Sequence, residues 1–88
     1  MKIIAIYDNG GKTFDRYTVV YDEVDTIRNI RGREILLYSS VGMSENPFHP
    51  QGFGQHGSAQ LGSHLGKQIS FEDLPEKCQQ LVMLDLEL

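Results

Sequence analysis

Short runs of apolar and β-branched residues, separated by glycine-containing turns, dominate the first half of the chain. The runs 3–7 and 17–21 flank Asp8-Asn9-Gly10-Gly11, and an Asn-Gly pair favours the positive backbone dihedral angles of hairpin turns. We therefore expect strands near residues 2–7 and 14–21 that pair antiparallel.

A third apolar run, residues 34–40, follows the turn signal Arg31-Gly32-Arg33 and is expected to be the central strand. The preceding segment 22–30 places Val24, Ile27 and Ile30 three residues apart. That spacing suits a strained strand, a helical turn or a loop equally, so the pattern leaves the structure of 22–30 open.

The C-terminal part reads as a short strand at 67–71 followed by a helix. Asp73 is a plausible N-cap, with Glu76 completing a capping box and Pro75 in the first turn. An apolar stripe then predicts one face packed on the sheet, with Cys78 in the core; its members are Leu74, Cys78, Leu81 and Val82. The alternation over 84–88 indicates that the helix frays or becomes extended there.

Residues 41–66 follow neither period and read as a long loop between the strands and the C-terminal strand–helix unit. They hold six of the nine glycines, two of the three prolines and all three histidines, with one charge at Glu45. Phe48 and Phe53 favour an ordered loop, because flexible linkers seldom keep large aromatic residues. Long loops in small domains are often functional, so binding residues are sought here first.

Together these elements predict one α+β domain over residues 1–88. It is a small antiparallel sheet of three to four strands packed by one C-terminal helix, with a long glycine- and histidine-rich loop over 41–66. A chain of 88 residues has no room for a second core, which excludes large two-lobed enzymes.

Composition and charge narrow the expected partners. The net charge is −4, and residues 72–88 account for it with five acidic residues and one lysine. An acidic C-terminal element repels phosphate, so nucleic acid is not an expected partner. No apolar run is long enough to span a membrane, and the run 3–6 is too short for a signal peptide. As the only cysteine of the sequence, Cys78 can form neither an internal disulfide nor a cysteine zinc cluster. We expect a cytoplasmic protein that makes no membrane contact.

The histidines are the strongest candidates for metal chemistry. His49, His56 and His64 are spaced by seven and eight residues, and imidazoles suit zinc, copper, nickel or ferrous iron. The spacing matches neither the two-histidine helical pattern of hydrolytic zinc sites nor any cysteine pair. Histidines that hydrogen-bond loop carbonyls explain the same residues, so no cofactor is expected and no catalytic residue is assigned.

Five stretches carry a resemblance to known sequences: YDNGGKT (7–13), DRYTVV (15–20), SENPFHPQG (44–52), HLGK (64–67) and FEDLPE (71–76). They are similar to segments of small uncharacterised proteins carried by phages, plasmids and bacterial genomes. The resemblance implies a bacterial or mobile-element setting and transfers no activity and no catalytic residue. Small accessory proteins of such elements often act by binding a host protein.

The favoured hypothesis is an accessory or binding protein that contacts a host protein or another copy of itself through loop 44–66. Its candidate contact residues are Asn46, Phe48, His49, Gln51, Phe53, Gln55 and His56. The alternative hypothesis is a metal-binding or metal-dependent enzyme built from His49, His56 and His64. Three imidazoles converging on one point would favour the alternative, and the sequence leaves the oligomeric state open.

Overall fold

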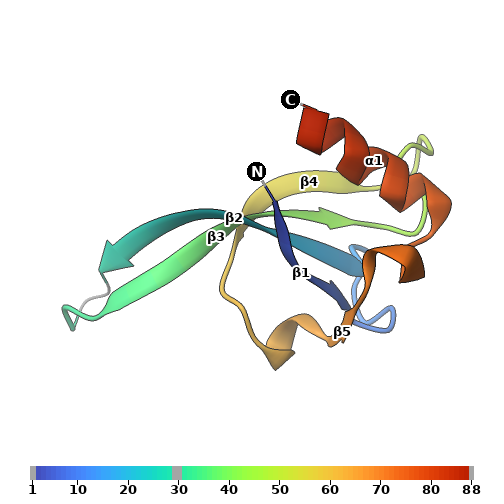
Figure 1. Cartoon of the computed structure of the whole chain (residues 1–88). Coiled ribbons are helices and arrows are strands. Elements are labelled where there is room, and N and C mark those ends of the chain that lie inside the picture. The colour runs from blue at the N-terminus through green and yellow to red at the C-terminus, as the bar shows by residue number, and fades with distance from the viewer. Residues whose placement is uncertain (1, 29–30, 88) are drawn as a thin grey trace.

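The computed structural model describes residues 2–28 and 31–87, which form an antiparallel sheet with a helix packed on one face (Figure 1). In this described part the sheet has five strands in the order β4-β3-β2-β1-β5. The strands are β1 (Ile3–Asp8), β2 (Tyr17–Arg28), β3 (Glu34–Met43), β4 (Gly54–Ala59) and β5 (Lys67–Ile69). Two short 3₁₀ helices, η1 (Ser63–Leu65) and η2 (Phe71–Asp73), precede the helix α1 (Glu76–Glu87). The predicted α+β class is confirmed, but the predicted number of three to four strands is too low, because the segment predicted as a long loop contributes β4.

The first predicted hairpin is present. The third predicted strand, β3, also forms, but it is not the central strand of the sheet. β1 and β2 pair antiparallel, and Gly10 and Gly11 adopt φ angles of 77° and 87°, which glycine reaches without steric cost. The middle strand of the sheet is β2 and not β3, because the glycine-rich segment supplies a further strand, β4, on the outer side of β3.

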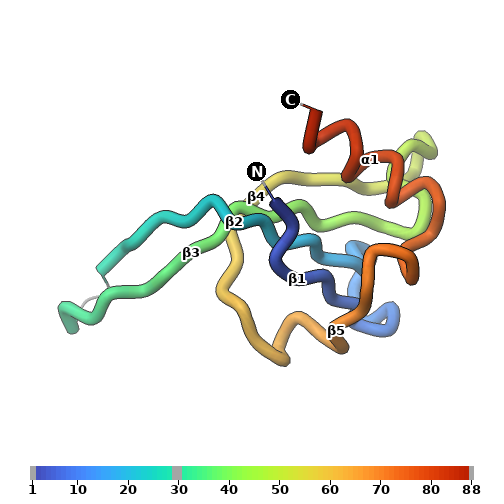
Figure 2. The backbone as a smooth tube through the Cα atoms, in the orientation of Figure 1, coloured from blue at the N-terminus to red at the C-terminus, as the bar shows by residue number. Residues whose placement is uncertain are grey.

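The segment that the sequence pattern left open continues β2 as far as Arg28, while Asn29 and Ile30 lie outside the described residues. Beyond an irregular register between Val20 and Val24, residues 24–28 pair only with 34–38 of β3. These ten residues form a two-stranded ribbon that projects from the body of the molecule (Figure 2). We call this ribbon the arm.

The main core lies between the sheet and α1. The predicted stripe is confirmed: Leu74, Cys78 and Val82 are buried and Leu81 packs against them. Their sheet partners are Ile6, Tyr17, Val19, Tyr21, Val41 and Met43. A smaller cluster on the opposite face contains Ala5, Tyr7 and Val20, with Tyr38 and Leu65 packed against it.

The predicted start of the helix is wrong. The Ser70 side chain accepts the backbone amide of Asp73, and the Asp73 carboxylate accepts the backbone amide of Ser70 at 3.0 Å. This capping box therefore belongs to η2. α1 begins only at Glu76, with the Pro75 carbonyl accepting the Gln79 amide at 3.0 Å. The prediction chose Asp73 as N-cap because the pattern Asp-x-x-Glu overlaps the pattern Ser-x-x-Asp that the chain uses.

Over the described residues 84–87 the predicted fraying or extended tail is absent, because α1 continues to Glu87, while Leu88 lies outside the described residues. Among the described residues no helix is long and apolar enough to cross a membrane.

The segment 41–66 is more regular than predicted. It contains the end of β3, all of β4 and the 3₁₀ turn η1. β4 reads Gly-Gln-His-Gly-Ser-Ala and has no β-branched or aromatic residue. Its extended conformation comes from pairing with β3, in a register that places His56 opposite Val41.

Candidate functional site

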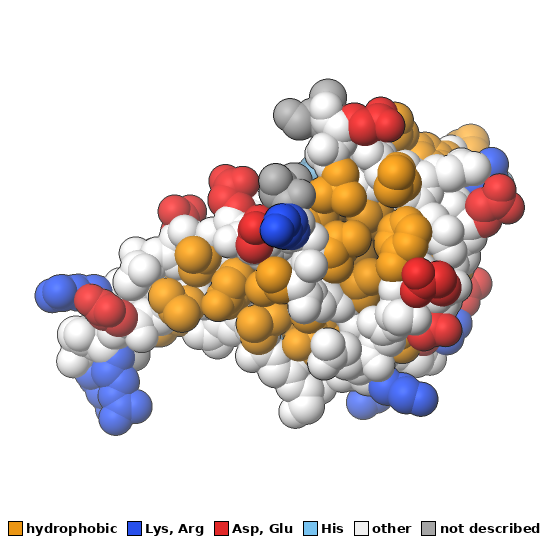
Figure 3. All heavy atoms as spheres, viewed as in Figure 1, with side chains coloured by type: hydrophobic (Ala, Val, Ile, Leu, Met, Phe, Trp, Pro, Cys, Tyr) orange, Lys and Arg blue, Asp and Glu red, His pale blue; other side chains and the backbone are white. Residues whose placement is uncertain are grey.

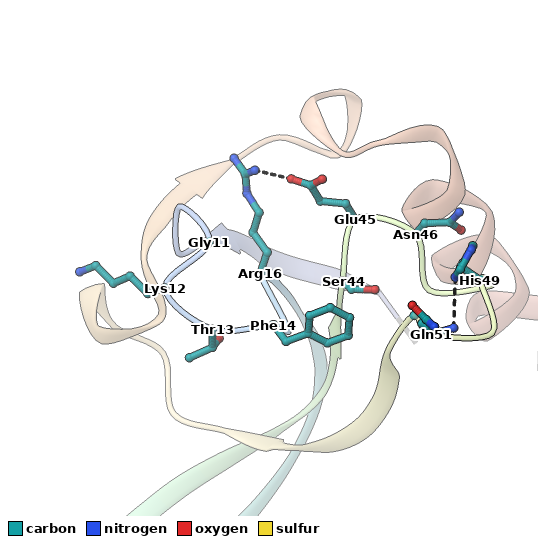
Figure 4. A pocket seen from close by; sticks show the side chains of 11 residues that line it. Gly11, Lys12, Thr13, Phe14, Arg16, Ser44, Glu45, Asn46, His49 and Gln51 are labelled. Atoms are coloured by element: carbon teal, nitrogen blue, oxygen red, sulfur yellow. Dashed lines mark hydrogen bonds and ion pairs between the residues drawn. The ribbon is translucent and has the colours of Figure 1, made fainter.

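An open groove of about 640 Å³ lies between the β1–β2 connection and the β3–β4 connection (Figure 4). One wall comes from the β1–β2 connection and the other from the β3–β4 connection. The lining residues are Gly11, Lys12, Thr13, Phe14 and Arg16 on the first wall and Ser44, Glu45, Asn46, His49, Gln51 and Gly52 on the second. We call it the loop groove. Two connections far apart in the sequence meet here because β1, β2 and β3 are neighbours in the sheet and both connections lie at the same end.

Asn9 shapes the first wall. Its side-chain oxygen accepts hydrogen bonds from the backbone amides of Gly11 at 2.8 Å and Lys12 at 3.1 Å. Its backbone amide donates to the Arg16 carbonyl at 3.0 Å. Asparagine commonly bonds to the backbone two residues ahead in this way. The groups at 11–16 are therefore presented on a fixed backbone.

Arg16 joins the two walls. Its guanidinium group donates to the Asp8 carboxylate through Nε at 2.8 Å and Nη2 at 3.0 Å, and to Glu45 Oε1 at 2.5 Å. The hydrogen bond from Arg16 is the main reason that the pKa of Asp8 lies below its ordinary value. Since two carboxylates already occupy the guanidinium group, Arg16 serves here as a clamp and not as a receptor for an anion.

Ser44 closes the second wall. Its amide donates to the Phe53 carbonyl at 2.8 Å, and its hydroxyl accepts the Phe53 amide at 2.9 Å. Gly52 makes a close approach inside the loop, because a Cβ at this position would lie 2.0 Å from the Asn46 carbonyl oxygen. The turn around 46–52 therefore requires glycine at residue 52.

Apart from Glu45, which is paired with Arg16, the groups that face the groove from this wall are neutral hydrogen-bonding groups. The Gln51 amide donates to His49 Nδ1 at 3.1 Å, so in a neutral imidazole the proton is on Nε2. Figure 4 shows the His49 and Gln51 side chains next to each other, with Asn46 on the same connection. Beside the paired Glu45, the wall thus offers neutral donors and acceptors.

Phe14 is the aromatic residue of the loop groove. The residue is 66% exposed, and its ring packs edge-to-face on Phe53 with ring centroids 6.5 Å apart. An exposed aromatic ring held by another ring has lost part of its rotational freedom before any partner binds. Sequence reasoning missed Phe14; the signal was a large aromatic residue in a polar turn.

The structure brings together three of the seven candidate contact residues in the loop groove, Asn46, His49 and Gln51. Phe53 supports the groove through Phe14. The other three lie elsewhere: Phe48 beside the outer face of α1, Gln55 in a shallow cavity on the sheet face opposite α1, and His56 beside Asp85 of α1.

The contact of His56 with Asp85 belongs to a polar cluster beneath α1. Asp85 is 7% exposed and accepts the Tyr21 hydroxyl at 3.0 Å, while His56 Nε2 lies 2.9 Å from both of its oxygens. The sequence analysis counted Asp85 only as one of the five acidic residues of the C-terminal element and did not predict its burial. The signal was its position three residues after Val82, on the buried stripe.

The three histidines have different environments. His49 accepts a loop amide, His56 bonds to Asp85, and His64 lies in η1. Within residues 2–28 and 31–87, no three His, Cys, Asp or Glu side chains gather closely enough to hold a metal ion. The geometry therefore gives the metal hypothesis no support in this part of the chain.

No protein-family model, curated protein or solved structure matches this chain. Functional interpretation consequently rests on the geometry of its surfaces.

Proposed function

We propose that this chain is a protein-binding module whose loop groove receives a segment of a partner protein. The observation that carries the proposal is Phe14, which is 66% exposed and yet held in place by Phe53 at the groove. An anchored aromatic ring next to neutral hydrogen-bonding groups is a common composition for protein recognition surfaces.

The chemistry of the groove favours an uncharged segment over a charged one. Asn46 and Gln51 supply amide donors and acceptors, and Arg16 is occupied by Asp8 and Glu45. The other basic lining residue, Lys12, extends away from Phe14 and Asn46 in Figure 4. A partner segment with an apolar side chain against Phe14 and with backbone amides facing Asn46 and Gln51 would match these groups. The bacterial or mobile-element setting implied by the resemblance makes a bacterial host protein the proposed source of that segment.

The test compares three immobilised proteins, the parent, Phe14→Ala and Leu61→Ala, in a bacterial lysate. Leu61 is the matched control, because it is 43% exposed and lies outside the loop groove. Proteins retained by the parent and by Leu61→Ala but lost from Phe14→Ala are identified by mass spectrometry. A partner segment is then titrated by calorimetry, and Phe14→Ala should weaken binding by about tenfold or more.

Nuclear magnetic resonance spectroscopy maps the contact with the partner segment independently. Titration with the partner segment should shift the amide signals of 11–16 and 44–52 and leave those of α1 in place. The proposal fails if Phe14→Ala retains the same proteins as the parent, or if the shifted signals lie outside the loop groove.

A further inference from the structure

The arm exposes apolar side chains on both of its faces. Val24, Ile27 and Leu36 are 45%, 46% and 50% exposed. The register pairs Thr26 with Leu36 and Val24 with Tyr38, so Val24, Leu36 and Tyr38 share one face of the ribbon. A two-stranded ribbon without a third strand or a helix against it is marginally stable in water. This face of the arm is therefore suited to being covered by another surface.

A second apolar surface lies on the outer side of α1. A groove of about 690 Å³ runs along the helix between Phe48, Phe71, Met83 and Leu84, and we call it the helix groove. Met83 and Leu84 are 50% and 51% exposed, and Phe48 is 45% exposed. Figure 1 shows the arm projecting away from the body that carries α1, so the arm of a chain does not cover the helix groove of the same chain.

The two surfaces carry opposite charges. The arm and its turn, residues 24–38, hold three arginines against Asp25 and Glu34, and Arg28 is paired with Glu34 at 3.8 Å. The unit that contains the helix groove has four acidic residues besides the buried Asp85 over residues 72–87, against Lys77, and Glu76 and Glu87 line the groove itself. In Figure 3 basic side chains gather at the outer end of the arm, while acidic side chains lie both along the arm and on the body. Opposite charge of this kind orients two surfaces as they meet.

Their lengths also agree. The arm contains five residue pairs, which span about 16 Å at roughly 3.3 Å per residue. α1 contains 12 residues, which span about 18 Å at roughly 1.5 Å per residue.

We propose that the arm of one copy of this chain docks in the helix groove of a second copy, and that the second copy returns the contact. Leu36 and Val24 lie against Met83 and Leu84, and the arginines at the end of the arm lie near the acidic residues of the helix unit. Such a reciprocal exchange has twofold symmetry and closes after two copies, because each arm and each groove is then occupied. The loop groove takes no part in the contact and stays open to a different partner.

The first test measures molar mass by light scattering over a range of protein concentrations. The parent should approach twice the 10.0 kDa of one chain. Leu36→Glu and Met83→Glu should each raise the dimer dissociation constant by about tenfold or more, while Leu61→Glu should leave it unchanged. Increasing salt should weaken the parent dimer.

Mixing the two variants separates this arrangement from others. One copy with an intact arm and one with an intact groove still make one of the two contacts, so an equimolar mixture of Leu36→Glu and Met83→Glu should recover part of the dimer. A parent that stays monomeric at every concentration would overturn the proposal. So would a Met83→Glu variant that dimerises like the parent, because arms would then pair with something other than the helix groove.

A cross-linking experiment adds a direct readout that does not depend on losing an interaction. Leu36→Cys mixed with Met83→Cys should form an intermolecular disulfide on mild oxidation, while either variant alone should form little. The native Cys78 is buried and should not interfere. Efficient cross-linking of Leu36→Cys alone would show arm-to-arm pairing and contradict the proposal. Far-ultraviolet circular dichroism of every variant confirms that the fold is retained, as expected for substitutions at half-exposed positions.

Discussion

Asp85 accepts hydrogen bonds from residues that lie 64 and 29 positions away in the sequence, Tyr21 on β2 and His56 on β4. A buried carboxyl group is costly unless its oxygens are satisfied, and here both oxygens have partners. One side chain therefore fixes the position of α1 over two strands of the sheet. Removing one of these partners should leave the buried carboxyl group one hydrogen bond short and so lower the free energy of unfolding.

Tyr21→Phe tests this contact. The variant keeps the buried ring and loses the hydroxyl, so the free energy of unfolding should fall by about 2 kcal/mol in urea titrations. Tyr38→Phe is the matched control, because the Tyr38 hydroxyl has no hydrogen-bond partner among the described residues. Equal stability losses in the two variants would contradict the assigned role of Asp85.

Cys78 gives a prediction with a defined pH window. Burial raises the pKa of its thiol from 9.0 to about 11, with Glu45 as a second cause. The native state thus holds the thiol proton more tightly than the unfolded chain does, and the resulting stability is present below pH 9 and is lost as the pH rises from 9 towards 11.

Cys78→Ala should lower stability by about 1 kcal/mol at neutral pH, because packing is lost. Between pH 9 and 11 the parent should lose more stability than the variant, since only the parent carries this thiol. Urea titrations at several pH values measure both effects. Parallel stability curves for the two proteins, or rapid labelling of the native thiol by a maleimide, would contradict the buried position.

At the scale of secondary-structure elements, the accuracy of the sequence analysis followed the strength of the local signal. The β1–β2 hairpin and the buried stripe of α1 were predictable, because turn glycines and helical periodicity act over a few residues. β4 was not predictable, since its extended backbone depends on pairing with β3. The loop groove was predicted only in part for the same reason: Phe14 meets the β3–β4 connection through tertiary contacts.

Asp73 gives the prediction at this scale. Its pKa lies below the ordinary value, mainly because the Ser70 amide donates to its carboxylate and secondly because the Ser70 hydroxyl does. A lowered pKa means that the stabilisation is present above pH 3.8 and is lost as the pH falls below that value.

Asp73→Ala should therefore lower the melting temperature at neutral pH, and the difference from the parent should vanish in strong acid. Glu72→Ala is the neighbouring control, because Glu72 is exposed and has no hydrogen bond or ion pair among the described residues. A melting temperature for Asp73→Ala equal to that of Glu72→Ala at neutral pH would contradict the capping role.

At the scale of the whole molecule, a packed body and a projecting arm have different roles. Both core clusters draw their buried members from the body, and among the arm residues only Tyr38 packs against one of them. Val24 and Tyr38 face each other where the arm leaves the body. The fold should therefore not depend on residues 25–37.

Replacing residues 25–37 with Asn-Gly tests this independence. Asn-Gly favours the tight turn that would join Val24 to Tyr38. The shortened chain should unfold cooperatively, with a free energy of unfolding within about 1 kcal/mol of the parent, because few buried contacts are lost. The parent is measured as a monomer, at low protein concentration, for this comparison. Loss of cooperative unfolding would show that the arm is part of the core.

The positions of the tyrosines make them intrinsic spectroscopic probes of folding. The chain has four tyrosines and no tryptophan, so absorbance and fluorescence in the near ultraviolet report mainly on tyrosine. Tyr17 and Tyr21 lie in the core beneath α1 and Tyr7 lies on the opposite face. The pKa of Tyr21 is raised, first by burial and then by Asp85. Burial also raises the pKa of Tyr17. Titration with base should thus reveal tyrosinates that form late, at Tyr17 and Tyr21, and their absorbance gives a spectroscopic signal for the opening of the core between α1 and the sheet.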